Sequence, residues 1–208
     1  MGIPCFFIEP TDRIRRALRR FRSPTTGKCP LPRVYCNAVV PLDEIESTTE
    51  TLNDTWPHDD PRWPTRCECG YAFSDKDEWQ LFTARLYRRV DNGEVMTLRE
   101  APPGAMWYAD GMIHGDPPRY CGPDGHCLAV VTPRNTDGTG RHEWIVDSRC
   151  SNCDMLDDHE HKCWVRHGTP PNITVDKNGR TCGAGAGSIL VHDGGWHGFL
   201  RNGELVVC

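Results

Sequence analysis

Clustered cysteines are the feature that most restricts how this chain can fold. The 208 residues include 12 Cys and 9 His, and most of the cysteines stand within a few residues of another one. The 20 Gly and 17 Pro predict frequent turns, while hydrophobic residues make up only 38% of the chain. A loop-rich chain with such a modest core is commonly reinforced by disulfides or bound metal. The nature of these cross-links is therefore the first question.

The start of the chain and its cysteine spacing favour metal binding over disulfides. The first nine residues are too short and too soon acidic to predict a signal peptide, and no apolar run approaches the ~18–20 residues of a membrane span. We therefore expect a reducing cytoplasm, where clustered cysteines are more often metal ligands than disulfides. The net charge of −5 also argues against a coat for nucleic acid that binds through overall basic charge.

A first zinc site is predicted around Cys67 and Cys69, which are followed directly by Gly70. Two thiolates in a tight turn relieved by Gly are typical of a zinc knuckle. Because zinc takes four ligands placed tetrahedrally, we expect Cys29 and Cys36, which flank a Pro-rich stretch, to complete the site. The alternative is that these thiols are buried or free, with one disulfide among them.

A second, denser cluster follows later in the chain. Cys150 and Cys153 have the C-x-x-C spacing, and His161 and Cys163 would face the same side of an extended strand. We predict that these four residues hold zinc in a closed site of three sulfurs and one nitrogen, with Cys182 as the alternative to Cys150. The competing interpretation is a Cys153–Cys163 disulfide with solvated histidines.

A third pair, Cys121 and Cys127, is separated by a Gly-Pro-Asp-Gly turn that would bring its ends together. Either a disulfide or a partial metal site with His114 or His126 would fit this spacing. Metal is the less favoured of the two.

The remaining patterns predict a loop-rich α+β fold stabilised by zinc. Residues 11–22 carry apolar side chains at helical spacing, which predicts an N-terminal amphipathic helix, and residues 74–77 resemble a capped helix start. We expect residues 1–75 to contain this helix, an acidic excursion and the zinc-knuckle region. Residues 76–208 are then expected to form a β-rich body with the second cysteine/histidine cluster.

Short antiparallel hairpins are predicted within the β-rich body. Asn-Gly between apolar flanks is a strong hairpin signal, and it occurs in residues 90–95 and 199–206. The Gly-rich segment 135–140 predicts another hairpin between two apolar runs, and the turn residues 176–179 follow a further short strand. We therefore expect most of the chain from about residue 84 onward to consist of short strands.

Charge is unevenly distributed in the first 60 residues. Six arginines cover the polar face of the predicted helix: Arg13, Arg15, Arg16, Arg19, Arg20 and Arg22. Arginines on a helix can bind phosphate or contact a partner, but an ordinary solvated face is favoured, and pairing with acidic groups is another option. Residues 34–60 contain seven acidic side chains and no Lys or Arg, which predicts a long excursion or a partner-binding arm.

Patterns that would indicate catalysis are weak. The Gly-rich segment 183–188 lacks the Gly-Lys-Ser/Thr ending of a phosphate-binding loop, so it predicts a tight turn. The best catalytic candidate is His159-Glu160-His161, where an open zinc site with Asp158 or Glu160 as general base would give a hydrolase or nuclease. The cysteine-rich ligand set argues against this chemistry, since a closed thiolate site suppresses Lewis acidity.

Several long strings carry a resemblance to known proteins. They are Phe6–Pro10, Pro57–Trp63 with Cys67–Tyr71, Tyr87–Trp107, Cys163–Pro171 through Thr181–Ser188, and Trp196–Gly203. Together they resemble cysteine-rich proteins of unassigned role from tailed bacteriophages and prophages, and they span most of the chain. The resemblance implies a phage protein made in the cytoplasm of a bacterial host, and it carries over no catalytic residues.

The sequence therefore leads us to expect a non-enzymatic, zinc-stabilised phage protein. We expect it to be a minor component of the virion, such as a capsid-decorating or head-to-tail accessory protein, in contact with other phage structural proteins and not with a membrane. Two alternatives stay open: a zinc-dependent nuclease or hydrolase, and a regulator that binds nucleic acid through its Arg-rich helix. Nucleic-acid binding is not favoured.

Overall fold

The computed structural model describes most of the chain, and every regular element in the described residues is a β-strand. The strands run from β1 (Ile3–Pro4) to β13 (Glu204–Val207). No helix long and apolar enough to cross a membrane occurs in this part of the chain. The described residues are 2–22, 29–30, 36–46, 56–110, 121–150, 153–155, 157–158, 161–176, 182, 188–192 and 194–208.

The chain forms two compact units, and each is built from more than one segment. Unit 1 comprises Met1–Glu9, Arg88–Val95 and Arg99–Cys208, whereas unit 2 comprises Pro10–Tyr87 and Met96–Leu98. The first nine residues thus belong with the C-terminal part of the chain. The sequence had instead suggested a single division between residues 75 and 76. Each unit contains one of the two predicted zinc clusters.

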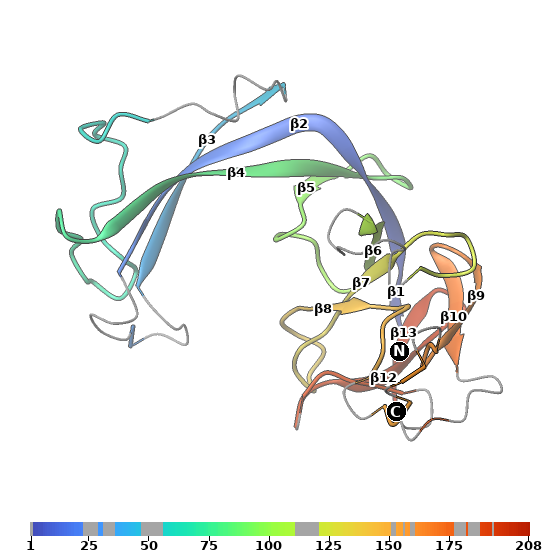
Figure 1. Ribbon diagram of the computed structural model, residues 1–208. Coiled ribbons are helices and arrows are strands. Elements are labelled where there is room, and N and C mark those ends of the chain that lie inside the picture. Colours follow the sequence, from blue (N-terminus) through green and yellow to red (C-terminus); the bar gives the residue numbers. More distant parts are fainter. Residues whose placement is uncertain are drawn as a thin grey trace. The chain divides into compact units, whose positions relative to one another are not determined.

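Unit 2 is organised around the long strand β2 (Phe6–Phe21). This strand lies between β3 (Asn37–Glu46) and β4 (Glu78–Arg89), and β4 also pairs with β5 (Val95–Thr97). Figure 1 shows the three long strands side by side. The antiparallel register of β2 and β3 places Leu18 opposite Val40, with an irregularity between Arg15 and Ala17.

The predicted helix over residues 11–22 is wrong, because this segment is the second half of β2. Arg, Ala and Leu favour helices, but strands on both sides of β2 supply hydrogen-bond partners for its backbone. Ala17 and Leu18 are adjacent and both buried, which means that both faces of the strand are covered there. Burial on two faces of a strand therefore produced a spacing that resembles one face of a helix.

The second predicted helix start, at residues 74–77, is also wrong. Asp77 instead closes a turn just before β4, and its carboxylate accepts hydrogen bonds from the backbone N–H and hydroxyl of Ser74 at 2.7 and 3.1 Å. The expected α+β class is therefore corrected to an almost entirely β structure, because both predicted helices are replaced by strands or by a turn.

The acidic segment begins as a strand, contrary to the excursion predicted for residues 34–60. Residues 37–46 form β3 along the Arg-rich half of β2. Glu44 accepts hydrogen bonds from both Arg13 and Arg15, with 2.8 Å between Nη2 of Arg15 and the Glu44 carboxylate. Opposite charges on neighbouring strands stabilise the pairing. Residues 47–55 of the acidic segment lie outside the described residues.

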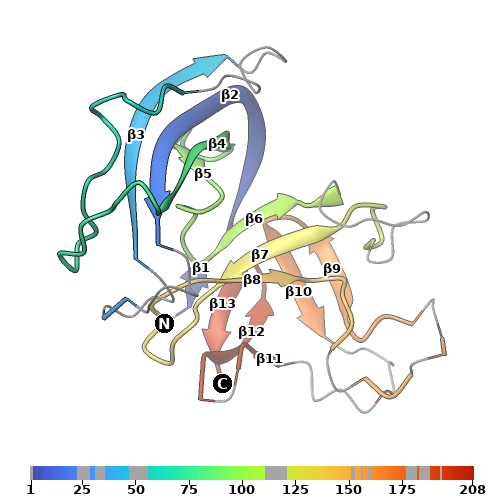
Figure 2. The same cartoon turned by 60° about the vertical axis from the view of Figure 1, so that its left-hand side comes forward.

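Unit 1 contains three groups of paired strands. In the first, β6 (Ala105–Tyr108) pairs in parallel with the start of β2 and antiparallel with β7 (Leu128–Thr132), and β7 pairs with β8 (His142–Ile145). Figure 2 shows β6, β7 and β8 as neighbours. In the second group β9 (Val165–Thr169) pairs with β10 (Asn172–Asp176). The third group has the order β1, β13, β12 (His197–Arg201) and β11 (Ile189–Leu190).

Hairpins occur at three of the turns that the sequence singled out. They join β4 to β5, β7 to β8, and β12 to β13. In the last, Asn202 and Gly203 have φ values of 47° and 73°, as a tight two-residue hairpin turn requires of its central residues. The turn predicted at residues 176–179 falls largely outside the described residues.

Candidate metal centres

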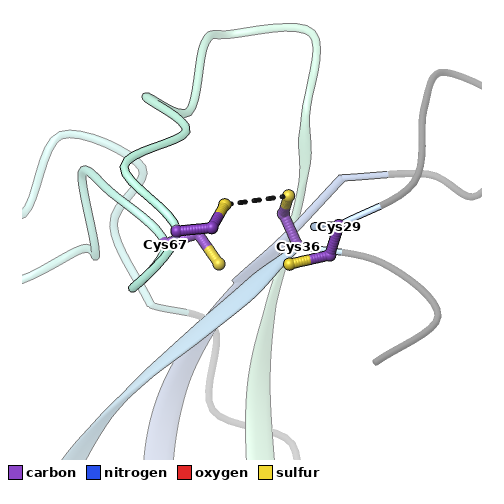
Figure 3. Close-up of side chains that lie close together, drawn as sticks. Cys29, Cys36 and Cys67 are labelled. Carbon is purple, nitrogen blue, oxygen red and sulfur yellow. Dashed lines mark hydrogen bonds between the residues drawn. The ribbon is translucent and has the colours of Figure 1, made fainter. Parts of the chain in front are cut away.

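The first candidate centre lies in unit 2 and consists of Cys29, Cys36, Cys67 and Cys69. Their four sulfur atoms all lie within 4.8 Å of one another, and those of Cys36 and Cys69 are 3.6 Å apart. Four sulfurs around a zinc ion at its usual bond length would be about 3.8 Å apart. Figure 3 shows the side chains of Cys29, Cys36 and Cys67 pointing into one shared space. The described residues thus form a tetrathiol site of the size that a metal ion needs.

A tight turn presents the second pair of thiols in this centre. The backbone N–H of Gly70 donates to the carbonyl of Cys67 at 2.8 Å, and that of Cys67 donates to the carbonyl of Tyr71 at 2.9 Å. Gly70 has a φ of 89°, which a residue with a side chain rarely adopts. The Gly after the second cysteine is therefore explained by the geometry of this turn.

Polar and aromatic contacts fix the segment that follows the turn. The hydroxyl of Tyr71 donates to the Asp77 carboxylate at 3.2 Å, and the Arg22 guanidinium lies 4.4 Å above the Tyr71 ring. Tyr71 and Phe73 both pack against the cysteine cluster. These contacts tie the segment after the turn to Arg22, next to the end of β2, and to Asp77 before β4.

The thiols of the first centre differ in acidity. A hydrogen bond with the backbone of Tyr71, together with the neighbouring thiols, lowers the pKa of Cys69 to about 7 against the effect of burial. Burial and then the adjacent thiols raise the pKa of Cys36 to about 12. The pKa of Cys69 therefore lies well below that of Cys36, and a bound cation would displace the protons of the thiols that ligate it.

The second candidate centre lies in unit 1 and consists of Cys153, His161, Cys163 and Cys182. One ligand atom from each lies within 4.8 Å of the other three, and all four residues are buried. Nε2 of His161 is buried and makes no hydrogen bond within the described part of the chain. A buried imidazole nitrogen without a partner is costly, and coordination to a metal ion would satisfy it.

Hydrogen bonds hold the loop that carries these ligands. The carboxylate of Asp158 accepts the backbone N–H of His161 at 3.1 Å. Arg149 donates from Nε to the carbonyl of His161 at 3.1 Å and from Nη1 to the carbonyl of Met155 at 2.8 Å. Such contacts around a metal site orient its ligands. This role of Arg149 was not predicted from the sequence. No sequence pattern around Arg149 indicates that its side chain binds the carbonyls of Met155 and His161, which lie 6 and 12 residues later.

The structure places Cys182, and not Cys150, in the second ligand group. Cys150 lies beside the group, and its backbone N–H donates to the sulfur of Cys163 at 3.3 Å. His161 and Cys163 are brought together by a loop, because β9 begins only at Val165. The expectation that they share one side of a strand is therefore wrong, although both contribute to the same group.

The third cysteine pair does not join a metal-ligand group among the described residues. The turn between Cys121 and Cys127 is present, with the N–H of Gly122 donating to the carbonyl of His126 at 2.8 Å. The ring of His126 instead contacts Asp110, at 2.7 Å from Nδ1 to the carboxylate. His114 lies outside the described residues. All twelve cysteines are among the described residues, and none of them forms a disulfide there.

The catalytic candidates are only partly described. Asp158 uses its carboxylate to hold the backbone of His161, and His159 and Glu160 lie outside the described residues. Residues 183–187 of the Gly-rich segment also lie outside them.

The arginines singled out in the sequence have contacts within unit 2. Arg13 and Arg15 pair with Glu44. Arg20 donates to the carbonyl of Ser74 at 2.8 Å. Three more guanidinium groups lie over aromatic rings: Arg16 over Trp56, Arg19 over Phe21 and Arg22 over Tyr71.

Comparison with known proteins gives no match: no protein-family model fits the chain, and no curated protein or solved structure is significantly similar to it. A function has to be argued from the two centres and their surroundings.

Proposed function

We propose that this protein is a binding protein held in shape by two structural zinc ions, one in each compact unit. The observation that carries the proposal is that each unit gathers four cysteine or histidine ligand atoms within 4.8 Å of one another. A structural zinc site uses four protein ligands, whereas a catalytic site leaves one position to water or substrate. Four protein donors in each group fill every position of a tetrahedral ion.

The chemistry of the donors supports zinc as the metal. Thiolate and imidazole donors select zinc over magnesium and calcium, which prefer oxygen ligands. Four thiolates can also hold an iron–sulfur cluster, but His161 in the second centre favours zinc there. Both sets, four cysteines and three cysteines with one histidine, are typical of structural zinc sites.

We infer further that the protein acts through contacts with other phage structural proteins, as a minor virion component such as a capsid-decorating or head-to-tail accessory protein. The resemblance to proteins of tailed phages supports this origin. The edge of unit 2 supports a role in contacts, since β3 pairs with β2 alone among the described residues. A partner strand can add to such an edge through backbone hydrogen bonds.

The zinc part of the proposal is tested by native mass spectrometry of protein purified without chelator. We expect two zinc ions per chain. Cys163→Ser should leave one zinc ion and lower the melting temperature markedly, because metal-binding energy at a structural site is folding energy. Cys208→Ser is the matched control, since this exposed thiol belongs to neither centre, and it should keep both ions. A zinc content near zero, with cysteines that can be alkylated only after reduction, would contradict the proposal.

The role in the virion is tested separately, by mass spectrometry of purified particles. The chain should be present in particles at a low copy number, and its absence would refute the virion role. A zinc enzyme is distinguished by Glu160→Gln in the phage. We expect unchanged viability, because four protein ligands leave no position for a catalytic water. Loss of viability by a variant that melts like the parent protein would favour the enzyme.

A further inference from the structure

Unit 1 contains a cavity of about 470 Å³ beside the second candidate centre. Strand β8 contributes His142 and Trp144 to its lining, β12 contributes His197, and the segments next to the second metal centre contribute Arg149 and Trp164. Its volume lies within the range of about 300–1,000 Å³ that is usual for small-molecule sites. None of the four ligand residues of the second centre lines the cavity. A ligand in the cavity would therefore not bind to the metal ion.

The apolar part of the lining is dominated by two tryptophans. The rings of Trp144 and Trp164 lie edge to face, with centroids 6.0 Å apart and an angle of 87° between their planes. Their contact with each other fixes the orientation of both rings. Ile189 and Leu190 of β11 add aliphatic surface. Such walls suit a flat, apolar ring more than a flexible polar chain.

The polar part of the lining is basic or neutral. The described residues that line the cavity include Arg149, two histidines and two serines, and no Asp or Glu. Arg149 carries a permanent positive charge because a guanidinium is not deprotonated in proteins, whereas burial, followed by the charge of Arg134, lowers the pKa of His142. Nε and Nη1 of Arg149 are fixed by carbonyls of the metal-binding loop. Its Nη2 is buried and makes no hydrogen bond within the described part of the chain, which is costly for a charged donor unless an acceptor reaches it.

We propose that this cavity binds a small aromatic anion, with its ring against Trp144 and Trp164 and its anionic group toward Arg149. A guanidinium held by two hydrogen bonds is already oriented, so little conformational entropy is lost when it binds an anion. Hydrogen bonds to an anionic group are stronger than those between neutral partners. The anion can be a carboxylate or a phosphate, because both present oxygen atoms that a guanidinium binds.

The test uses the full chain with its metal as purified and two probes of this class, adenosine 5′-monophosphate and indole-3-carboxylate. Their uncharged counterparts, adenosine and indole, are measured alongside by isothermal titration calorimetry. We expect at least one anionic probe to bind at a single site, about tenfold or more tightly than its uncharged counterpart. The probe that binds identifies phosphate or carboxylate as the preferred group. No binding by either probe, or equal binding with and without the charge, would overturn the proposal.

Variants locate the binding site. Trp144→Leu and His197→Ala should each weaken binding of the anionic probe about tenfold. His197 is exposed at the start of β12, so its removal should leave the melting temperature unchanged. His167→Ala is the matched control, because this histidine lies on β9 of the same unit outside the cavity. Binding that survives both cavity variants, or that is lost equally in the control, would show that the ligand binds elsewhere.

Discussion

Arg166 and Asp147 form a buried ion pair in unit 1, with 3.3 Å between Nη2 of Arg166 and Oδ2 of Asp147. Their side chains are only 1% and 4% exposed. Two further nitrogen–oxygen contacts of 2.9 and 2.7 Å join Arg166 to Asp124, and the Asp147 carboxylate also accepts the N–H of Leu128 at 3.3 Å. One guanidinium on β9 thus connects the 121–127 turn to the end of β8.

Replacing Arg166 should strongly destabilise the protein. In Arg166→Met the Asp147 carboxylate would stay buried without its cation, which typically costs about 3–5 kcal/mol of unfolding free energy. Urea unfolding measures this loss, and adding Asp147→Asn should restore part of it. Arg141→Met is the control. Its ion pair with Glu143 is 32% and 41% exposed, so the expected cost is below about 1 kcal/mol. Equal losses in the two variants would contradict the importance of the buried pair.

Gly122 should tolerate no side chain while Arg166 is present. A Cβ atom added at Gly122 would overlap Nη2 of Arg166, so the guanidinium would have to move away from Asp124. Overpacking of this kind costs about 1–3 kcal/mol, and Gly122→Ala should show that loss in urea unfolding. The same change in the Arg166→Met background should cost less, because the clashing atom is gone. Equal costs in both backgrounds would refute the explanation.

Acid should weaken the contribution of Asp124. Burial raises the pKa of this carboxyl, but the hydrogen bonds from Arg166 and from the backbone of His126 outweigh it and lower the pKa from its usual 3.8 to about 2. A carboxyl with a lowered pKa stabilises the folded state above the unfolded pKa, and this contribution is lost as the pH falls from about 4 to 2.

The measurement compares the parent protein with Asp124→Asn as a function of pH. The stability difference should be constant above about pH 5 and should shrink between pH 4 and 2. Loss of metal in acid affects both proteins, so it cancels in the difference. If the stability difference between the two proteins grew as the pH falls, the lowered pKa of Asp124 would be contradicted.

The identity of the fourth ligand in the second centre is decided by two serine substitutions. Cys182→Ser should reduce the zinc content from two ions to one, because the sulfur of Cys182 lies in the ligand group. Cys150→Ser should keep both ions, since Cys150 is outside the ligand group and serine retains its backbone hydrogen bond to the sulfur of Cys163. Native mass spectrometry checks both variants, and the opposite pattern would restore Cys150 as the ligand.

Binding of DNA should be weak and should not depend on the arginines of β2. These side chains contact Glu44, the Ser74 carbonyl and aromatic rings, and the net charge is −5. Changing Arg15, Arg16, Arg19 and Arg20 to Ser should lower the stability of unit 2 more than any affinity for DNA. Tight binding that falls steeply with salt, as counterion release requires, and that is lost in this variant would contradict the expectation.

The metal ligands show which part of a site local sequence can predict. Cys67 and Cys69 are brought together by the turn that they themselves form. Their spacing in the sequence is therefore enough to predict that their thiols lie close together. Cys182 is brought to the second centre by the fold of unit 1. From the sequence alone, Cys182 could be named only as an alternative to Cys150. The cavity next to that centre is lined by residues of β8, β11 and β12, which are far apart in the sequence. No local sequence pattern predicts that these strands line one cavity.

The strand β2 shows the corresponding limit for the fold. Its residues favour a helix by propensity, and the strands that override this preference, β3 and β4, come from later parts of the chain. A local window contains none of those partners. Turns such as Asn202-Gly203 were predictable because their backbone conformation depends on the two residues themselves.

The pairing of β1 with β13 joins Ile3 to Leu205 and so sets an order for folding during synthesis. Unit 2 uses residues 10–87 and 96–98, all of which are made before residue 100, so it can form and bind its metal while translation continues. In unit 1 the start of β2 can pair with β6 as soon as residues 105–106 have been made, but β1 has to remain without β13 until the end of the chain is synthesised. During that interval β1 lacks its partner strand β13. The chain on the ribosome then has unit 2 complete and unit 1 incomplete.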